Sequence, residues 1–210
     1  MGPGSGLSPV RYTSDASANA IWIDSVKRSF YTRHMDTKIK LIAAADQLFD
    51  RHGFTATGMD RLTQGAGMSS RTLYKHVGSK TALMTTVLTE RDKRFFERMR
   101  EANNVDTLFR ALESWVRVEG CRGCLFLRAY GETGGDIPEI AAIVLAHKAA
   151  LWEKIRDVVL VETEGHNALA LTEQILVLFE GATAAAIYRG AQSVEAARHA
   201  AIALVERARL

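Results

Sequence analysis

The fold of this 210-residue chain is decided by residues 52–83, which read HGFTATGMDRLTQGAGMSSRTLYKHVGSKTAL. Gly53 and Gly67 divide the stretch, because glycine takes the left-handed backbone conformation that ends a helix or makes a tight turn. Ser69 and Ser79 are typical N-cap residues, whose hydroxyl oxygen accepts a hydrogen bond from a free N–H group at a helix start. The stretch therefore predicts short helices separated by tight turns.

Helical periodicity extends this pattern on both sides. We expect four helices, over about residues 37–52, 57–64, 69–76 and 79–100. Thr57 and Asp60 stand three residues apart and predict a capping box that opens the second helix. Two short helices joined by a three-residue turn that contains glycine form a helix-turn-helix. In this motif, at about residues 58–77, the second helix enters the major groove of DNA.

The helix expected over residues 69–76 has two different faces. Leu73 and Val77, four residues apart, face the core. The side chains left facing outward are Ser70, Arg71, Tyr74 and Lys75. Short hydroxyl groups reach base edges or phosphates, and an arginine can donate two hydrogen bonds to guanine. This helix is therefore the candidate DNA-reading element.

Residues 36–83 closely resemble the tetracycline-repressor (TetR) family of bacterial transcriptional regulators. The resemblance rests on His52-Gly53-Phe54, Thr57, Met59-Asp60-Arg61-Leu62, Ala66-Gly67-Met68-Ser69, Thr72-Leu73-Tyr74-Lys75-His76-Val77 and Ser79-Lys80-Thr81-Ala82-Leu83. Gly58 departs from the family's usual Ser or Thr, and Val77 from a frequent Phe. The resemblance implies an all-α fold of about nine helices. An N-terminal three-helix domain would bind DNA, and a C-terminal helical domain would dimerise and bind a small-molecule inducer.

The resemblance also implies roles for single residues. Thr57, Tyr74, His76 and Lys80 would contact backbone phosphates, and Ser69, Ser70, Arg71, Thr72 and Lys75 would contact the groove. Three of these residues have a plainer alternative. Tyr74 can be a core aromatic near Phe54, His76 can simply end its helix, where a cation favours the dipole, and Lys80 can be an ordinary solvated lysine. Thr57 and Ser79 are expected to cap helices in either case.

The remaining sequence predicts five further helices. They are expected over about residues 106–119, 124–132, 138–162, 168–188 and 193–209, with Asp106 and Ser193 as caps and Pro138 in a first turn. The small residues of 181–186, with Ala197 and Ala201, allow close approach between helices. The last two helices resemble the family's dimer interface, a four-helix bundle across a two-fold axis. The alternative is that these small residues pack within one chain.

Two features of this C-terminal part carry possible chemistry. An effector pocket lined by Trp115, Phe126, Tyr130 and Trp152 is one interpretation, and core packing explains the same aromatics about as well. Cys121 and Cys124 form a C-x-x-C, but a structural zinc needs four ligands and a thioredoxin-like site needs a βαβ unit. Burial of Cys124 at a helix start is the plain interpretation, and a thiol switch is the alternative.

Composition and charge narrow the class of function. Apolar residues make up 47% and charged residues 24% of the chain, which is typical of a globular protein. The formal charge is +2 over residues 1–33, +5 over 34–100 and −4 over 101–210, and a basic block favours a polyanionic partner. The apolar region 169–188 is interrupted by two glutamates, so we expect no membrane span. No phosphate loop, metal-spaced histidine pair or nucleophile elbow occurs, so we expect no enzyme, catalytic residue, metal or cofactor.

These observations predict a domain order and a function. Residues 1–34 are a flexible tail, a cloning remnant or a short helical arm, and Met35 can be the true start. Residues 35–82 would bind DNA and residues 83–210 would bind the effector and dimerise. The expected function is a cytoplasmic, homodimeric repressor, released from an inverted-repeat DNA operator by a small-molecule effector. The alternative is a helical small-molecule or thiol sensor with vestigial DNA binding.

Overall fold

The structure is a computed structural model that describes residues 37–209. The chain divides into two units, residues 1–39 and 40–210. Of the first unit only residues 37–39 are described, and they are helical. The expectations for residues 1–34 and for Met35 lie outside the described residues. All but three of the described residues belong to the second unit.

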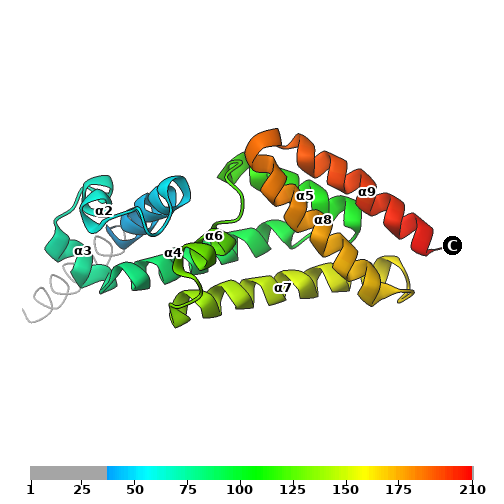
Figure 1. Ribbon diagram of the computed structural model, residues 1–210, viewed down its shortest axis with the longest axis horizontal. Coiled ribbons are helices and arrows are strands. Elements are labelled where there is room, and N and C mark those ends of the chain that lie inside the picture. The colour runs from blue at the N-terminus through cyan, green and yellow to red at the C-terminus, as the bar shows by residue number, and fades with distance from the viewer. Residues whose placement is uncertain (1–36, 210) are drawn as a thin grey trace, which may run out of the picture. The chain divides into compact units, whose positions relative to one another are not determined.

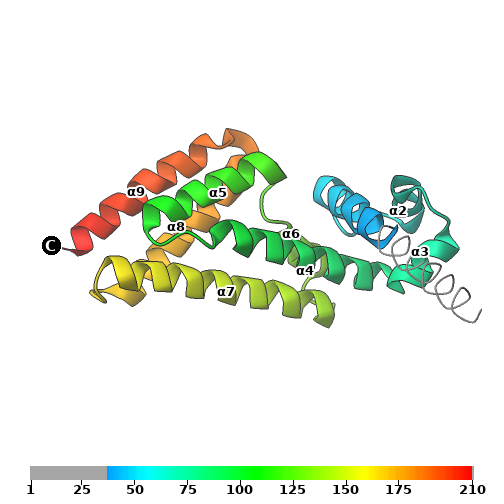
Figure 2. The ribbon, with the colours of Figure 1, turned by 180° about the vertical axis from the view of Figure 1, so that it is seen from behind.

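The described part of the chain is all-α, as expected, with nine helices and no strand between residues 37 and 209. The first helix covers residues 37–52 and is called helix 37–52 below. The others are α2 (Met59–Ala66), α3 (Ser70–Val77), α4 (Lys80–Met99), α5 (Val105–Glu119), α6 (Leu125–Thr133), α7 (Pro138–Glu162), α8 (Ala168–Arg189) and α9 (Gln192–Ala208) (Figure 1). In two opposite views α4 and α7 run alongside each other (Figures 1 and 2), and they are in contact.

Side-chain caps fix several of the helix starts. Ser69 accepts a hydrogen bond from the Thr72 N–H group and Ser79 accepts one from Ala82, so both expected caps are confirmed. Two other expected caps are wrong. Asn104, not Asp106, caps α5 and forms a reciprocal capping box there. The last helix begins at Gln192, so Ser193 lies inside it.

Two apolar cores are built along the second unit, and α4 contributes to both. The head core gathers helix 37–52, α2, α3 and the first half of α4, with α6 and the start of α7 packed against them; its buried members include Leu41, Phe49, Leu62, Leu73, Leu83, Phe126 and Ile140. The body core gathers the second half of α4 with α5, α7, α8 and α9. The helices that carry the helix-turn-helix therefore complete their core with segments far along the chain.

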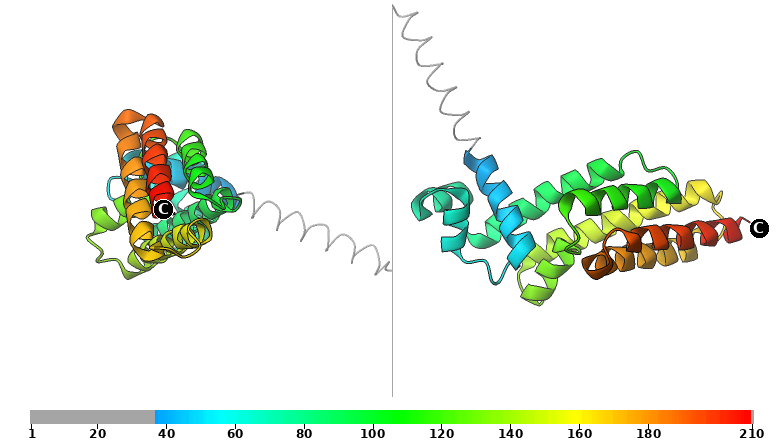
Figure 3. Two further views of the ribbon diagram at one scale, coloured as in Figure 1. Left: turned by 90° about the vertical axis from the view of Figure 1, so that its right-hand side faces the viewer. Right: turned by 90° about the horizontal axis from the view of Figure 1, so that it is seen from above.

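The body core brings α5, α8 and α9 side by side (Figure 3). Ala182 and Ala186 of α8 and Ala197 and Ala201 of α9 are all buried in it. These small residues let two helices of one chain approach closely, which is the alternative left open by the sequence. The opposite face of α8 is exposed and carries Leu169, Val177, Ile187 and Tyr188.

Among residues 37–209, α8 alone is long and apolar enough to cross a membrane, with a mean hydropathy of 1.3 over its most apolar window. Its buried side chains pack against α7 and α9 in the body core. A core helix of a folded domain meets the same criterion, so the length and hydropathy of α8 do not indicate a membrane span.

Candidate nucleic-acid interface

The helix-turn-helix consists of α2, α3 and the turn between them. Gly67 ends α2 with φ = 62°, a left-handed conformation that favours glycine. Ser69 then opens α3, and the Leu73 side chain is fully buried in the head core. Leu62 of α2 is buried in the same core. The two short helices are therefore held in a fixed relation by a tight turn and a shared apolar contact.

The outward face of α3 is polar and basic. Ser70, Arg71, Tyr74 and Lys75 are exposed and lie one and four residues apart, which places them on one side of the helix. The Tyr74 side chain is 48% exposed, so Tyr74 is not the core aromatic of the alternative interpretation. Phe54 is itself buried, and its ring centroid lies 5.8 Å from that of Phe49. The structure thus brings four of the expected contact residues together on one exposed surface, called the reading face below.

Thr57 differs from the expectation. The N-cap of α2 is Gly58, which offers no side-chain hydrogen bond, and Thr57 precedes it fully buried. The Thr57 hydroxyl donates hydrogen bonds to the carbonyl oxygens of Gly53 at 2.6 Å and Leu48 at 3.3 Å. The expected capping box with Asp60 is therefore wrong. The hydroxyl fastens the turn after helix 37–52, and a buried group of this kind is not presented to a phosphate.

The remaining expected contact residues lie at the borders of the reading face. The hydroxyl groups of Ser69 and Thr72 are hydrogen-bonded to each other, with their oxygens 2.9 Å apart. His76 is half-buried on the last turn of α3. Lys80 donates to the Thr55 carbonyl oxygen at 3.3 Å, and its ammonium group lies 4.4 Å from the centre of the Phe54 ring. Burial lowers the pKa of Lys80. Lys80 is therefore held by the turn at residues 54–55 and is not the freely solvated lysine of the alternative.

A second site lies in the body of the unit, where a cavity opens between α4, α5, α6, α7 and α8. Trp115 and Phe126 line it, as expected from the sequence. Tyr130 and Trp152 are not among its lining residues. Tyr130 packs near Gly135, and the Trp152 indole donates to Glu173 at 2.8 Å. The polar groups in the cavity wall were not expected: Arg91, Cys124, His147, Lys148, Glu180 and Thr183.

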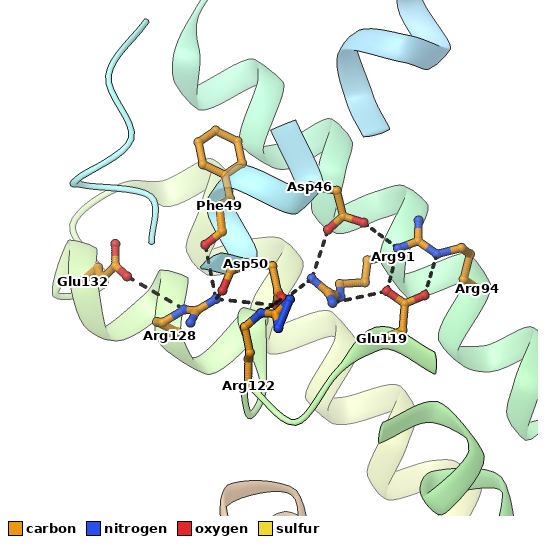
Figure 4. A network of polar contacts seen from close by, with 9 residues as sticks. All are labelled: Asp46, Phe49, Asp50, Arg91, Arg94, Glu119, Arg122, Arg128 and Glu132. Carbon is orange, nitrogen blue, oxygen red and sulfur yellow. Dashed lines mark hydrogen bonds and ion pairs between the residues drawn. The ribbon is translucent and has the colours of Figure 1, made fainter. Parts of the chain in front are cut away.

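Helix 37–52 is joined to the rest of the unit by a network of ion pairs centred on Asp50 and Arg91 (Figure 4). Arg91 on α4 lies 3.0 Å from Asp46 and 3.2 Å from Asp50, both on helix 37–52, and 3.2 Å from Glu119 at the end of α5. Arg94, on the more exposed side of the network, also forms ion pairs with Asp46 and Glu119. Because the Arg91 side chain is only 7% exposed, these charges interact in a poorly screened environment.

The same network reaches α6 and the loop before it. Arg122 lies 2.8 Å from Asp50, and Arg128 donates to the carbonyl oxygens of Phe49 at 3.2 Å and Asp50 at 2.6 Å. One turn further along α6, Glu132 accepts a hydrogen bond from the Thr55 N–H group at 2.8 Å. Arg128 therefore satisfies carbonyl groups at the C-terminal end of helix 37–52. Glu132 holds the chain just beyond that end.

The network and the cavity share a wall. Arg91 lines the cavity and binds Asp46 and Asp50, while Gly123 and Cys124 line the cavity directly after Arg122. The sequence offered only a weak signal for this arrangement, since Asp46 and Asp50 stand four residues apart on one helix face. Their partners lie between 41 and 78 positions away in sequence, and periodicity cannot pair residues at such separations.

The polar and basic reading face lies on α3, the second helix of the helix-turn-helix, which is the helix that enters the major groove in DNA-binding proteins of this class. Residues 41–87 match the sequence model of the family described as bacterial regulatory proteins, tetR family. Over these residues, which contain α2 and α3, the chain is similar to the DNA-binding part of that family. A search of curated protein sequences gave no match.

Solved structures share the fold over most of the chain. SCO4454, a TetR-family transcriptional regulator from Streptomyces coelicolor, aligns with a TM-score of 0.76 at 22% identity, covering 84% of this chain and 97% of that one. A putative TetR transcriptional regulator from Streptomyces avermitilis aligns at 0.66 and 22% identity, covering 81% and 98%. The reduced form of Escherichia coli NemR aligns at 0.64 and 20% identity, covering 79% and 95%. At these identities the likeness concerns the fold.

Proposed function

We propose that this protein is a homodimeric transcriptional repressor that leaves an inverted-repeat DNA operator when a small-molecule effector binds. The observation that carries the proposal is the reading face, on which Ser70, Arg71, Tyr74 and Lys75 are exposed while Leu73 anchors the helix. Ser70, Arg71 and Lys75 would contact the groove, and Tyr74 would reach a phosphate. Ser69, Thr72, His76 and Lys80 would add contacts at the border of this face.

The proposed dimer would form through the outer faces of α8 and α9. On α8 the exposed stripe holds Leu169, Val177, Ile187 and Tyr188, whose side chains are between 59% and 78% exposed. On α9 the exposed face holds the small residues Ala196, Ala200 and Ala203. An apolar stripe beside small residues suits close helix packing across a two-fold axis. A dimer would also supply two reading faces, as an inverted repeat requires.

Release of the protein from its operator would begin with effector binding in the cavity. Arg91 stands in the cavity wall and at the same time holds Asp46 and Asp50 of helix 37–52. A ligand that binds better when Arg91 has moved would therefore disfavour the arrangement of helix 37–52 described here. Because its target is chromosomal DNA, the protein would act in the cytoplasm.

The proposal is tested by DNA binding at several salt concentrations. Duplexes selected from a random pool by the full-length protein should converge on an inverted repeat. Fluorescence anisotropy should then show specific binding about 10³-fold or more tighter than binding to scrambled DNA, with affinity that falls as salt rises. Failure of the selection to converge, with only weak salt-dependent binding to every duplex, would overturn the proposal and favour a sensor with vestigial DNA binding.

A further inference from the structure

His147 is a buried polar side chain in the cavity wall that the proposed DNA-binding function leaves unused. The residue is 4% exposed and lies on α7. Its ring stacks face to face on Phe126 of α6, with centroids 3.7 Å apart and planes 5° apart. Phe95 and Phe96 of α4 meet it at larger interplanar angles, with centroids 5.1 Å and 5.6 Å away. The imidazole is therefore fixed in orientation on three sides by aromatic rings.

One of its two nitrogens has a partner. Nδ1 lies 2.7 Å from the Oδ1 atom of Asp92. An ionised carboxylate only accepts hydrogen bonds, so Nδ1 carries the proton and donates it. Burial also lowers the pKa of His147, which favours the neutral ring. In that tautomer Nε2 carries no proton and is an acceptor.

The second nitrogen, Nε2, is without a hydrogen-bond partner in the part of the chain that the structure describes. His147 lines the cavity, whereas Asp92, the partner of Nδ1, does not. The ring edge that carries Nε2 lies on the side of the imidazole away from Asp92, and we infer that it is the edge available to a ligand in the cavity. A ligand that supplies a donor to this nitrogen gains a hydrogen bond there.

The rest of the wall determines the shape of the ligand. Phe95, Trp115, Phe126 and Phe179 surround the space with aromatic rings, and Leu112 and Leu151 complete the apolar part. Aromatic rings pack best against a planar aromatic partner, in offset or edge-to-face contacts. The charged groups in the wall already have partners, since Lys148 lies 2.6 Å from Glu180 and Arg91 binds three carboxylates. The wall is therefore suited to a neutral planar ring.

From this arrangement we propose that the cavity binds a neutral hydroxylated aromatic, a phenol, whose O–H group donates a hydrogen bond to Nε2 of His147. This inference rests on the proposed function, in which the cavity is the effector site. The cavity volume in the described state is about 30 Å³, room for about two water molecules, so a six-membered ring enters as lining side chains move apart. Lys148 and Glu180, 21% and 25% exposed, are the pair that would open.

The test compares phenol with toluene, which has the same ring and a methyl group in place of the hydroxyl. Binding to the full-length protein is measured by isothermal titration calorimetry and by the shift in thermal unfolding. We expect phenol to bind at least about tenfold more tightly than toluene, because only phenol can donate a hydrogen bond to Nε2. A cavity that is apolar only would show the reverse order, since toluene is the more hydrophobic ligand.

A substitution locates the hydrogen bond. His147→Phe keeps a flat ring against Phe126 but removes the acceptor, so phenol affinity should fall about tenfold and the preference over toluene should disappear. His166→Phe, an exposed histidine between α7 and α8, serves as the matched control and should leave both affinities unchanged. Circular dichroism checks that each variant is folded, and the wild-type comparison of the two ligands needs no variant.

Two results would overturn the inference: toluene binding as tightly as phenol, or no phenol binding at millimolar concentration. Operator affinity is measured separately, first without phenol and then with it, and loss of DNA binding without phenol would count against the proposed function alone. Phenol binding that leaves operator affinity unchanged would keep the phenol site and remove its role in operator release.

Discussion

Asp50 and Arg91 form an ion pair at 3.2 Å in which both side chains are only 7% exposed. The pair joins the last turn of helix 37–52 to the middle of α4, and Asp50 also forms ion pairs with Arg122 and Arg128. Removal of one partner from a buried network leaves the other charges without compensation. Loss of the Asp50 carboxylate would therefore affect three arginines at once.

Asp50→Asn should destabilise the protein strongly. The amide has the same shape but no charge, so three arginines would be left short of an anionic partner. We expect a loss of about 3 kcal/mol in the free energy of unfolding, measured by urea denaturation. Glu113→Gln, which breaks an exposed pair with Arg117 on α5, should cost less than about 1 kcal/mol. Equal small losses in both variants would show that the network contributes no more than a surface pair.

Arg71→Ala and Lys80→Ala should weaken DNA binding in different ways. Removing a bidentate contact from Arg71 to guanine should cost about 1–3 kcal/mol on the selected operator and much less on scrambled DNA. Removing a phosphate contact of Lys80 should weaken binding to all sequences and lower the salt dependence by about one ion. Anisotropy titrations over a range of salt concentrations measure both effects. Arg71 would not be a base-reading residue if its replacement weakened binding to both duplexes alike.

Val177→Arg should produce a folded monomer. Val177 is 69% exposed on the outer stripe of α8, so the substitution leaves the body core intact and places a charge in the proposed dimer interface. Leu145→Arg on α7, at a position 59% exposed, is the matched control and should stay dimeric. Light scattering measures the mass and circular dichroism the helix content. Dimers in both variants, or a monomer only for Leu145→Arg, would place the interface elsewhere.

The stability of the protein should fall between pH 7 and pH 5 because of His147. Burial lowers its folded pKa below the ordinary value of 6.5, so the unfolded chain binds more protons between these two values. The stabilisation by the neutral ring is therefore complete above about pH 6.5 and is lost as the pH falls toward the folded pKa. The charged groups around the ring are Asp92 and Arg91 on α4, Lys148 on α7 and Glu180 on α8.

Urea denaturation of the wild type and of His147→Phe at about pH 7.5 and about pH 5 measures this contribution. The variant should lose less stability on acidification than the wild type. His52 contributes in the same window, since desolvation and the charges of Arg61 and Arg51 lower its pKa, but it is present in both proteins and cancels in the comparison. An identical loss in both proteins would show that His147 is not the titrating group.

The sequence predicted the features that depend on neighbouring residues. Ser69, Gly67 and Ser79 act within a few residues of themselves, and all three positions are as expected. The prediction that Thr57 caps α2 was wrong for a local reason. A threonine hydroxyl can bond to backbone groups on either side of it, and that of Thr57 donates back to the Gly53 carbonyl oxygen rather than accepting from α2. Helix spacing alone could not distinguish these two directions.

The cavity and the ion-pair network depend on contacts across the chain. Trp115 and Trp152 are both spaced as inward-facing aromatics, but only Trp115 lines the cavity, whereas Trp152 pairs with Glu173. His147 lies on a helix whose apolar residues gave no indication of its Asp92 partner 55 positions away. Pairings at such distances are set by how α4, α6 and α7 pack, and a single sequence does not contain that information in its periodicity.

The head core has a consequence for how DNA specificity can be transferred between regulators. Leu125, Phe126 and Ala129 of α6 and Ile140 and Val144 of α7 are buried together with the side chains of helix 37–52, α2 and α3. A graft that moved only helix 37–52, α2 and α3 into another scaffold would expose the apolar surface that these partners cover and would leave Asp50 without Arg122 and Arg128. New specificity is therefore reached more readily by single substitutions on the outward side of α3 than by exchange of a separable module.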